Sequence, residues 1–249
     1  FGYYPGLFSL MPYYEKVREY GDWEQRDLWE YELDLDTAEI ERLLEHLWEI
    51  RGIRFDYFFF DENCSYRLLR LLEVARPTLQ LTPRFRTWAI PADTVRAVAR
   101  DAGLVRSVRF RPSATTELRH QATFLTRDER RLAVHLADGT VAPDAAAVAA
   151  LPEATRATLL TVAHDATRLA WIGRSEERDP PLSRARALLV ARSRLSVAGD
   201  PVPPAPAPAT RPDEGHATAR ASIAAGVRAA RPFVEVAARP AFHDLLDPE

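Results

Sequence analysis

The sequence predicts an α+β protein that is mostly helical in the part present. Three observations lead to this prediction. Apolar residues recur at helical spacing in several segments before residue 112, the following stretch is rich in Ala and Arg with helical patterning, and two segments near the C-terminal end alternate like strands. With 249 residues, 47% of them hydrophobic, the chain can bury the core of one large or two small domains.

Composition excludes several classes of protein. The formal net charge is −3, and the arginines form no basic stripe interleaved with aromatic residues, so a nucleic-acid partner is not indicated. Cys64 is the only cysteine, which excludes an internal disulfide framework and a cysteine-based zinc cluster. No pair of histidines has the spacing of a zinc motif, and we therefore expect neither a metal nor a cofactor.

Both ends of the chain suggest a piece of a longer protein. The sequence begins at Phe1 without an initiator methionine or an apolar signal segment, and it stops at Glu249 directly after a predicted strand and turn. On this expectation, the lack of targeting signals says nothing about where the parent protein resides.

The first predicted helix follows an aromatic, acidic stretch. Residues 1–35 show no clean period and are expected to form turns and short extended pieces. Asp36 or Thr37 can then cap a helix, and Gly52 lies just past its end. One face of this helix is apolar and consists of Ile40, Leu43, Leu44, Leu47 and Trp48.

Two further helices are predicted before residue 112. One carries an apolar stripe and stops at Pro77; the stripe consists of Cys64, Leu68, Leu71, Leu72 and Ala75. The other has Asp93 as its N-cap and ends at Gly103. The aromatic run 55–60 between the first and second helices has an ambiguous conformation, and it must be buried or cover a site.

The second half is predicted to consist of helices followed by strands. Thr126 and Glu129 form a capping box, and helical patterns cover 152–172 and 183–196. A proline-rich segment follows that is either a linker or an ordered extended strap. Residues 218–227 and 233–238 alternate like strands. The expected divisions are a domain over 1–112, a helical region over 113–198, the proline-rich segment over 199–213 and the start of a β-rich region over 214–249.

The segment around Cys64 is the candidate site for chemistry. Cys64 stands in the first turn of the second helix, directly after the capping-type residues Asp61 and Asn63. Backbone N–H groups and the helix dipole there favour a thiolate, and the same groups can hold an oxyanion. The carboxylates of Asp61 and Glu62 work against the thiolate, so a histidine partner is needed. The alternative is that Cys64 is a small buried hydrophobe in line with the leucine stripe.

Three sequence motifs carry a resemblance to a known family. They are Tyr20-x-x-x-Glu24-x-Arg26-Asp27-x-Trp29-Glu30-Tyr31, His46-Leu47-Trp48-Glu49 and Tyr57-x-Phe59-x-Asp61-Glu62-Asn63-Cys64-Ser65. In these the chain resembles the Lnb N-terminal periplasmic domain family, named after a bacterial lipoprotein N-acyltransferase. Weaker matches continue at 111–113, 215–216 and 239–247. The resemblance implies a circularly permuted relative of papain-like and NlpC/P60 thiol enzymes.

The resemblance assigns roles and a function. It implies that Cys64 is the nucleophile and that Asn63 and Ser65 shape or support the oxyanion site. The family's histidine is expected upstream of Phe1, so residues 1–112 are the C-terminal portion of the enzyme domain. The implied function is cysteine-dependent acyl transfer through a thioester, acting on lipoprotein or phospholipid acyl groups. The implied setting is the envelope of a Gram-negative bacterium, in the periplasm or at the outer membrane, with membrane association of the full-length protein.

Two other functions remain open. One is an NlpC/P60-like cysteine peptidase or amidase, and the other is a non-enzymatic envelope scaffold whose cysteine belongs to the core. Tyr57 and Phe59 are candidates for lining an acyl-chain pocket, with core packing as the alternative.

Other polar residues have a functional and a structural interpretation. Glu24 and Arg26 are candidates for binding a polar head group or peptide, with a solvated ion pair as the alternative. His46 is interpreted as a packed structural histidine, with the missing general base as the alternative. His120, His135 and His164 are expected to face solvent or cap turns, and His216 and His243 are interpreted as structural rather than catalytic.

Overall fold

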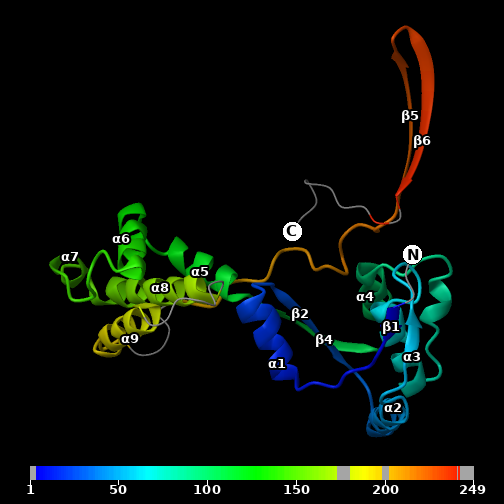
Figure 1. Ribbon diagram of the computed structural model, residues 1–249, viewed down its shortest axis with the longest axis horizontal. Coiled ribbons are helices and arrows are strands. Elements are labelled where there is room, and N and C mark those ends of the chain that lie inside the picture. Colours follow the sequence, from blue (N-terminus) through cyan, green and yellow to red (C-terminus); the bar gives the residue numbers. More distant parts are fainter. Residues whose placement is uncertain (1–3, 173–179, 198–201, 240, 242–249) are drawn as a thin grey trace. The chain divides into compact units, whose positions relative to one another are not determined.

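The computed structural model describes residues 4–172, 180–197, 202–239 and 241 (Figure 1). It confirms the α+β class, with many helices and three small two-stranded sheets among these residues. The chain divides into two compact units. The first unit comprises the described residues of 1–10, 31–109 and 208–249, and the second comprises those of 11–30 and 110–207.

The first unit is built around helix α3. The unit contains strands β1 (Tyr4–Gly6) and β3 (Phe55–Tyr57), helices α2 (Thr37–Glu49), α3 (Cys64–Ala75) and α4 (Pro91–Ala99), the 3₁₀ turn Thr82–Arg84, and strands β5 (Arg220–Arg228) and β6 (Arg231–Arg239). Strand β1 pairs antiparallel with β3, Gly6 lying opposite Phe55. Helix α3 packs against both α2 and α4. The buried core between these helices consists of Leu69, Leu79, Leu81, Ala97 and Leu104.

A single arginine, Arg76, links three parts of the first unit. It caps the C-terminal end of α3 and binds both carboxylate oxygens of Glu39, at 2.5 and 2.8 Å. It also donates to the backbone carbonyls of Asp34 and Gly103. Glu39 is the third residue of α2 and closes a capping box with Asp36. The guanidinium therefore fixes the start of α2 relative to the end of α3 and the turn before β4 (Val105–Arg111).

A second polar network holds residues 211–216, at the end of the proline-rich segment, in the first unit. Asp213 is buried and accepts from the Tyr31 hydroxyl (2.7 Å) and from Arg211. Although burial raises the pKa of Asp213, these two hydrogen bonds hold it below its ordinary value. Arg96 of α4 donates to the carbonyls of Asp213 and His216. These contacts hold residues 211–216 against α4 and β2 (Leu28–Leu33).

The second unit is helical. It contains α1 (Tyr13–Val17), a π-helix (Arg18–Trp23), α5 (Ala114–Thr123), α6 (Arg127–Asp138), α7 (Ala146–Ala149), α8 (Glu153–Ile172) and α9 (Pro180–Ser193). Helix α8 packs against α5, α6 and α9, and its Leu159 is fully buried. Val202 and Ala205 of the proline-rich segment are also buried, and the Ala205 N–H donates to Glu117 (2.9 Å). Residues 202–207 are thus an ordered strap of this unit.

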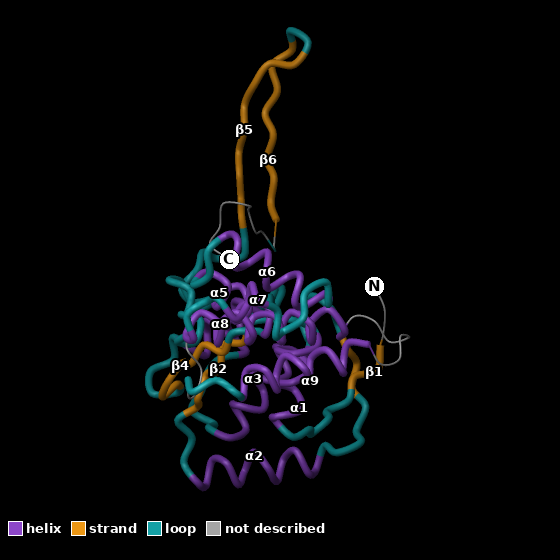
Figure 2. Tube along the Cα trace, turned by 90° about the vertical axis from the view of Figure 1, so that its left-hand side faces the viewer, coloured by secondary structure: helices purple, strands orange, loops and turns teal. Residues whose placement is uncertain are grey.

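Strands β5 and β6 form a hairpin of nine residues on each side (Figure 2). They pair antiparallel from Arg220 opposite Arg239 to Arg228 opposite Arg231. Ala229 and Ala230 form the two-residue turn and both have positive φ, at 49° and 60°. Two positive φ angles give the turn whose twist matches that of the flanking strands. The prediction of two strands here is confirmed.

Several local predictions are wrong in detail. Residues 13–23 are helical rather than extended. Helix α4 begins at Pro91 after Ile90, so Asp93 lies inside its first turn and pairs with Arg96 instead of capping. Proline fits the first helical position because its missing N–H has no partner there.

The apolar stripe predicted for α2 is only partly covered. Ile40, Leu44 and Trp48 are exposed in the described part of the chain, while Leu43 and Leu47 are partly buried. Helix α2 is held to α3 by polar contacts as well, since Arg42 donates twice to the Ala75 carbonyl. The helix itself and its Asp36 cap are confirmed.

Acid is expected to weaken the Glu39–Arg76 link. Hydrogen bonds from Arg76 and the Asp36 backbone lower the pKa of Glu39 from 4.5 to about 2. A carboxylate with a lowered pKa in the folded state stabilises the fold above its ordinary pKa, and this contribution is lost as the pH falls to the folded value. We expect the free energy of unfolding of the Glu39→Gln variant to fall less steeply between pH 4.5 and pH 2 than that of the wild type. Urea titrations across this range measure it.

The matched control is Glu41→Gln, which removes an exposed carboxylate from the same helix. This variant should retain the acid dependence of the wild type. An equal flattening in both variants would show that the Arg76 contact is not the cause.

Candidate functional site

Cys64 is the first residue of α3, and Asn63 is the N-cap residue before it. Asn63 has extended backbone angles, and its Oδ1 accepts from the N–H groups of Ser65 (3.1 Å) and Tyr66 (3.2 Å). The N–H of Cys64 meets no acceptor among the residues that the structure describes. One backbone donor therefore remains open at the residue that carries the thiol.

The Asn63 amide also anchors the chain around the site. It is only 4% exposed, and its Nδ2 donates to the carbonyls of Phe59 (3.1 Å) and Ala89 (2.6 Å). The Ser65 hydroxyl donates to Asn63 Oδ1 at 2.7 Å. The polar atoms of both side chains are thus engaged in the helix cap, and they act on Cys64 by fixing the start of α3. The link to Ala89 was not foreseen from the sequence because it joins residues 26 positions apart.

The Cys64 side chain is exposed in the described structure. Leu68, one helical turn later, is exposed as well, whereas Leu69, Leu71 and Ala75 are buried. The predicted stripe is therefore confirmed at Leu71 and Ala75 but not at its start, and Cys64 is not a core residue of the described chain.

Tyr57 of strand β3 neighbours the thiol. The pKa of its hydroxyl is raised, and burial is the largest cause. The charge of Cys64 and a hydrogen bond with Cys64 raise it further. Strand β3 pairs with β1, and Asn63 holds the carbonyl of Phe59, two residues after the strand. Tyr57, named from the sequence as a lining residue, thus lies beside the sulfur.

A charge pair compensates the acidic residue before the helix. Glu62 accepts from Arg67 at 2.5 Å, and Arg67 also donates to the Asp56 carbonyl (3.2 Å) and lies over the ring of Phe55. The repulsion expected between Glu62 and a thiolate is therefore offset by Arg67, which stands three residues after Cys64 on α3. Arg67 was missed, although its helical spacing from Cys64 is a signal that the sequence contains.

The aromatic run leaves two rings in solvent. Phe59 is 69% exposed and Phe60 is 54% exposed, and the two rings contact each other edge to face at 5.2 Å. Both precede the cap directly in the chain, and Phe59 is fixed to it by its carbonyl. The segment leading into α3 thus presents apolar surface close in sequence to the exposed thiol.

The described histidines have contacts elsewhere. His46 contacts Glu49 (3.4 Å), His164 contacts Asp165 (2.8 Å) and His216 contacts the Ala217 carbonyl (2.6 Å). His120 packs against Phe124, and His135 is exposed near the end of α6. None of these five histidines forms a hydrogen bond with Cys64, and the prediction for His243 lies outside the described residues.

Glu24 and Arg26 belong to the second unit. They form an ion pair with each other at 3.1 Å, with the Arg26 side chain largely exposed. The site built around Cys64 in the first unit does not contain them.

The described residues contain neither a cluster of metal-binding side chains nor a helix suited to span a membrane. No group of three or more His, Cys, Asp or Glu side chains there is arranged to hold a metal ion. No helix in that part of the chain combines the length and apolar character needed to cross a bilayer.

Three family models match consecutive parts of the chain. Residues 1–101 match the Lnb N-terminal periplasmic domain, residues 108–204 match a domain of unknown function, DUF7842, and residues 209–249 match another, DUF7840. The first match supports the family suggested by the motifs around Cys64 and indicates an envelope setting. No curated protein and no solved structure matches the chain.

The Asn63 anchor gives a prediction about stability. Asn63→Ala removes the cap of α3 and leaves the Phe59 carbonyl and the buried Ala89 carbonyl without their donor. We expect the free energy of unfolding to fall by about 2 kcal/mol, as for a lost cap combined with unsatisfied buried groups. Urea denaturation followed by circular dichroism measures this loss.

The comparison variant is Thr126→Ala, which removes the cap of α6. Thr126 accepts from the Glu129 N–H at 3.3 Å in an exposed setting, so its loss should cost about 1 kcal/mol. Equal losses in the two variants would contradict the anchoring role of Asn63.

Proposed function

We propose that Cys64 is the nucleophile of a cysteine-dependent acyltransferase of the bacterial envelope. The observation that carries this proposal is an exposed thiol on the first residue of α3, at a capped helix start. Its support is that the same segment carries the Lnb-like motif within the matched residues 1–101. The proposed setting is the periplasm or the outer membrane of a Gram-negative bacterium.

The proposed chemistry runs through a thioester. The Cys64 sulfur attacks the carbonyl carbon of an acyl ester, a C–S bond forms and the ester C–O bond breaks. The thiol proton passes to a general base and on to the oxygen of the departing alcohol. An amine, such as a lipoprotein N-terminus, then attacks the thioester. A C–N bond forms, the C–S bond breaks, and the sulfur regains a proton. The general base in this proposal is the histidine expected upstream of Phe1.

The helix start supplies the oxyanion donor in this scheme. The N–H groups of Ser65 and Tyr66 are already bound to Asn63, so the Cys64 N–H is the donor that remains. The dipole of α3 adds partial positive charge at the same end. Such fixed donors stabilise the negative oxygen of a tetrahedral intermediate.

The substrate class follows from the surface beside the thiol. Phe59, Phe60 and Leu68 are all more than half exposed, and they flank Cys64 in the sequence or lie one helical turn along α3. Exposed apolar side chains grouped at one site mark a surface that an apolar ligand covers. We therefore propose that the acyl chain of a phospholipid or lipoprotein lies against these residues, with Tyr57 beside the sulfur.

An acyl adduct on Cys64 tests the proposal. We expect the intact protein, incubated with phospholipid vesicles in the absence of an amine acceptor, to gain the mass of one long-chain acyl group. Peptide mapping should place it on Cys64, and hydroxylamine should release it because it is a thioester. The Cys64→Ser variant should show no hydroxylamine-labile adduct.

Different adducts separate the competing functions. A peptide-derived adduct on Cys64 after incubation with cell-wall peptides, without an acyl adduct, would replace the transferase with an amidase. Full biological activity of the Cys64→Ser protein would exclude catalysis by this residue and favour a scaffold.

A further inference from the structure

The β5–β6 hairpin has two chemically different faces. Side chains on a strand alternate between faces, and the register places cross-strand partners on the same face. One face, called here the apolar face, carries no polar side chain; it consists of Ala221, Ile223, Ala225, Val227, Pro232, Val234, Val236 and Ala238. The opposite face carries every charged residue of the two strands.

The apolar face is uncovered in the described structure. Its four large residues, Ile223, Val227, Val234 and Val236, are each between 71% and 78% exposed. A two-stranded hairpin is marginally stable in water by itself. An uninterrupted, exposed apolar face of this kind therefore indicates a surface that binds another molecule.

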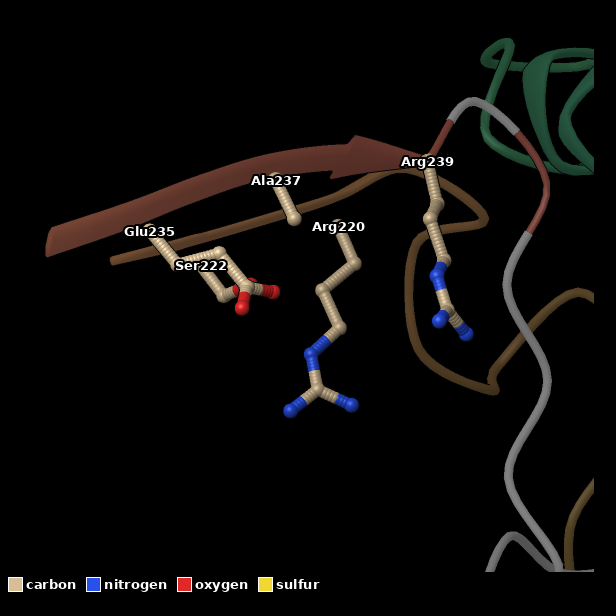
Figure 3. A pocket seen from close by; sticks show the side chains of 5 residues that line it. All are labelled: Arg220, Ser222, Glu235, Ala237 and Arg239. Atoms are coloured by element: carbon tan, nitrogen blue, oxygen red, sulfur yellow. The ribbon is translucent and has the colours of Figure 1, made fainter. Parts of the chain in front are cut away.

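The polar face carries arginines at both of its ends. Arg220 and Arg239 are cross-strand partners at one end, and Arg228 and Arg231 are partners next to the turn. Figure 3 shows Arg220, Arg239 and Glu235 pointing to the same side of the hairpin, around a hollow that Ser222 and Ala237 also line. Four arginines against one glutamate make the hairpin cationic in a chain whose net charge is −3.

We propose that the hairpin docks flat on an anionic lipid surface. Its apolar face enters the boundary between head groups and acyl chains, and its terminal arginines reach lipid phosphates. Amphipathic elements with arginines and a continuous apolar face bind lipid in this way. This inference rests on the hairpin alone and is independent of the chemistry of Cys64.

The outer edges of the described hairpin fit the polar boundary between water and lipid. Among the described strands, β5 and β6 pair only with each other, so each has an outer edge of unpaired N–H and C=O groups. Such groups are costly in the hydrocarbon core but are satisfied by water and head groups at the interface. The charge argues for lipid rather than a second copy, because two cationic hairpins repel each other whereas anionic lipids attract both.

Vesicle sedimentation of the 249-residue chain tests the proposal. We expect it to bind vesicles of phosphatidylcholine and phosphatidylglycerol more tightly than vesicles of phosphatidylcholine alone, and salt should weaken that preference. The test variant changes Ile223, Val227, Val234 and Val236 together to Thr, which keeps the β-branched shape and strand propensity. Its partition coefficient onto the anionic vesicles should fall roughly tenfold or more.

The matched control changes Ser222, Ala224 and Ala237 to Thr on the opposite face of the same strands. This variant should bind vesicles like the wild type, which separates the loss of apolar surface from damage to the hairpin. Amide exchange of the strand residues verifies that the hairpin forms in both variants.

Three results would overturn the proposal. The first is the absence of vesicle binding by the wild type, and the second is equal binding by the wild type and the apolar-face variant. The third is that the wild type is a dimer in solution and the apolar-face variant is a monomer, which would assign the face to a second copy. Vesicle binding by a wild-type chain that gains no acyl adduct on Cys64 would support this proposal and contradict the acyltransferase, so the failures of the two proposals are distinguishable.

Discussion

The geometry of the site depends on the hydrogen bonds of one buried amide. Asn63 accepts at the start of α3 through Oδ1 and donates through Nδ2 to two carbonyls that precede other elements. Both polar atoms of this side chain are hydrogen-bonded, which stabilises the conformation of the chain that enters the helix. That conformation places Cys64 at the first helical position with its side chain in solvent and its own N–H open. The chemical proposal follows from this placement.

Local sequence signals predicted much of the fold. The structure has the predicted Asp36 cap, the Thr126 capping box, the helix beginning at Cys64 and the C-terminal strand pair, which all follow from residue type and spacing over a few positions. The errors arise where a longer-range contact competes with a local signal. Asp93 has the chemistry of a cap, but Pro91 starts the helix and Asp93 pairs with Arg96 and Thr218 instead. The apolar face of α2 is only partly covered, while polar contacts of Glu39 and Arg42 join that helix to Arg76 and Ala75.

The candidate site was predictable only where it depends on neighbouring residues in the sequence. The residue types at adjacent positions predict the helix start and its Asn63 cap. The exposure of Cys64, by contrast, depends on how α3 is rotated against α2 and α4. Periodicity did not fix that rotation, because Leu68 and Leu69 satisfy two different apolar stripes. Tyr57 beside the sulfur depends on strand pairing, and the Ala89 carbonyl depends on a distant loop. The two faces of the C-terminal hairpin, by contrast, follow from alternation once its register is known.

The most direct measurement is the rate at which a small neutral thiol reagent modifies Cys64, compared between the folded chain and the chain in denaturant. An exposed thiol reacts without unfolding, whereas a sealed one reacts only through the rare opened state. The structure predicts that the two rates lie within about tenfold of each other once the denaturant effect on the reagent is corrected with a small thiol. Protection of the folded chain by roughly a thousandfold or more would mean that the thiol is buried, and the assignment of Cys64 as a displayed nucleophile would be wrong.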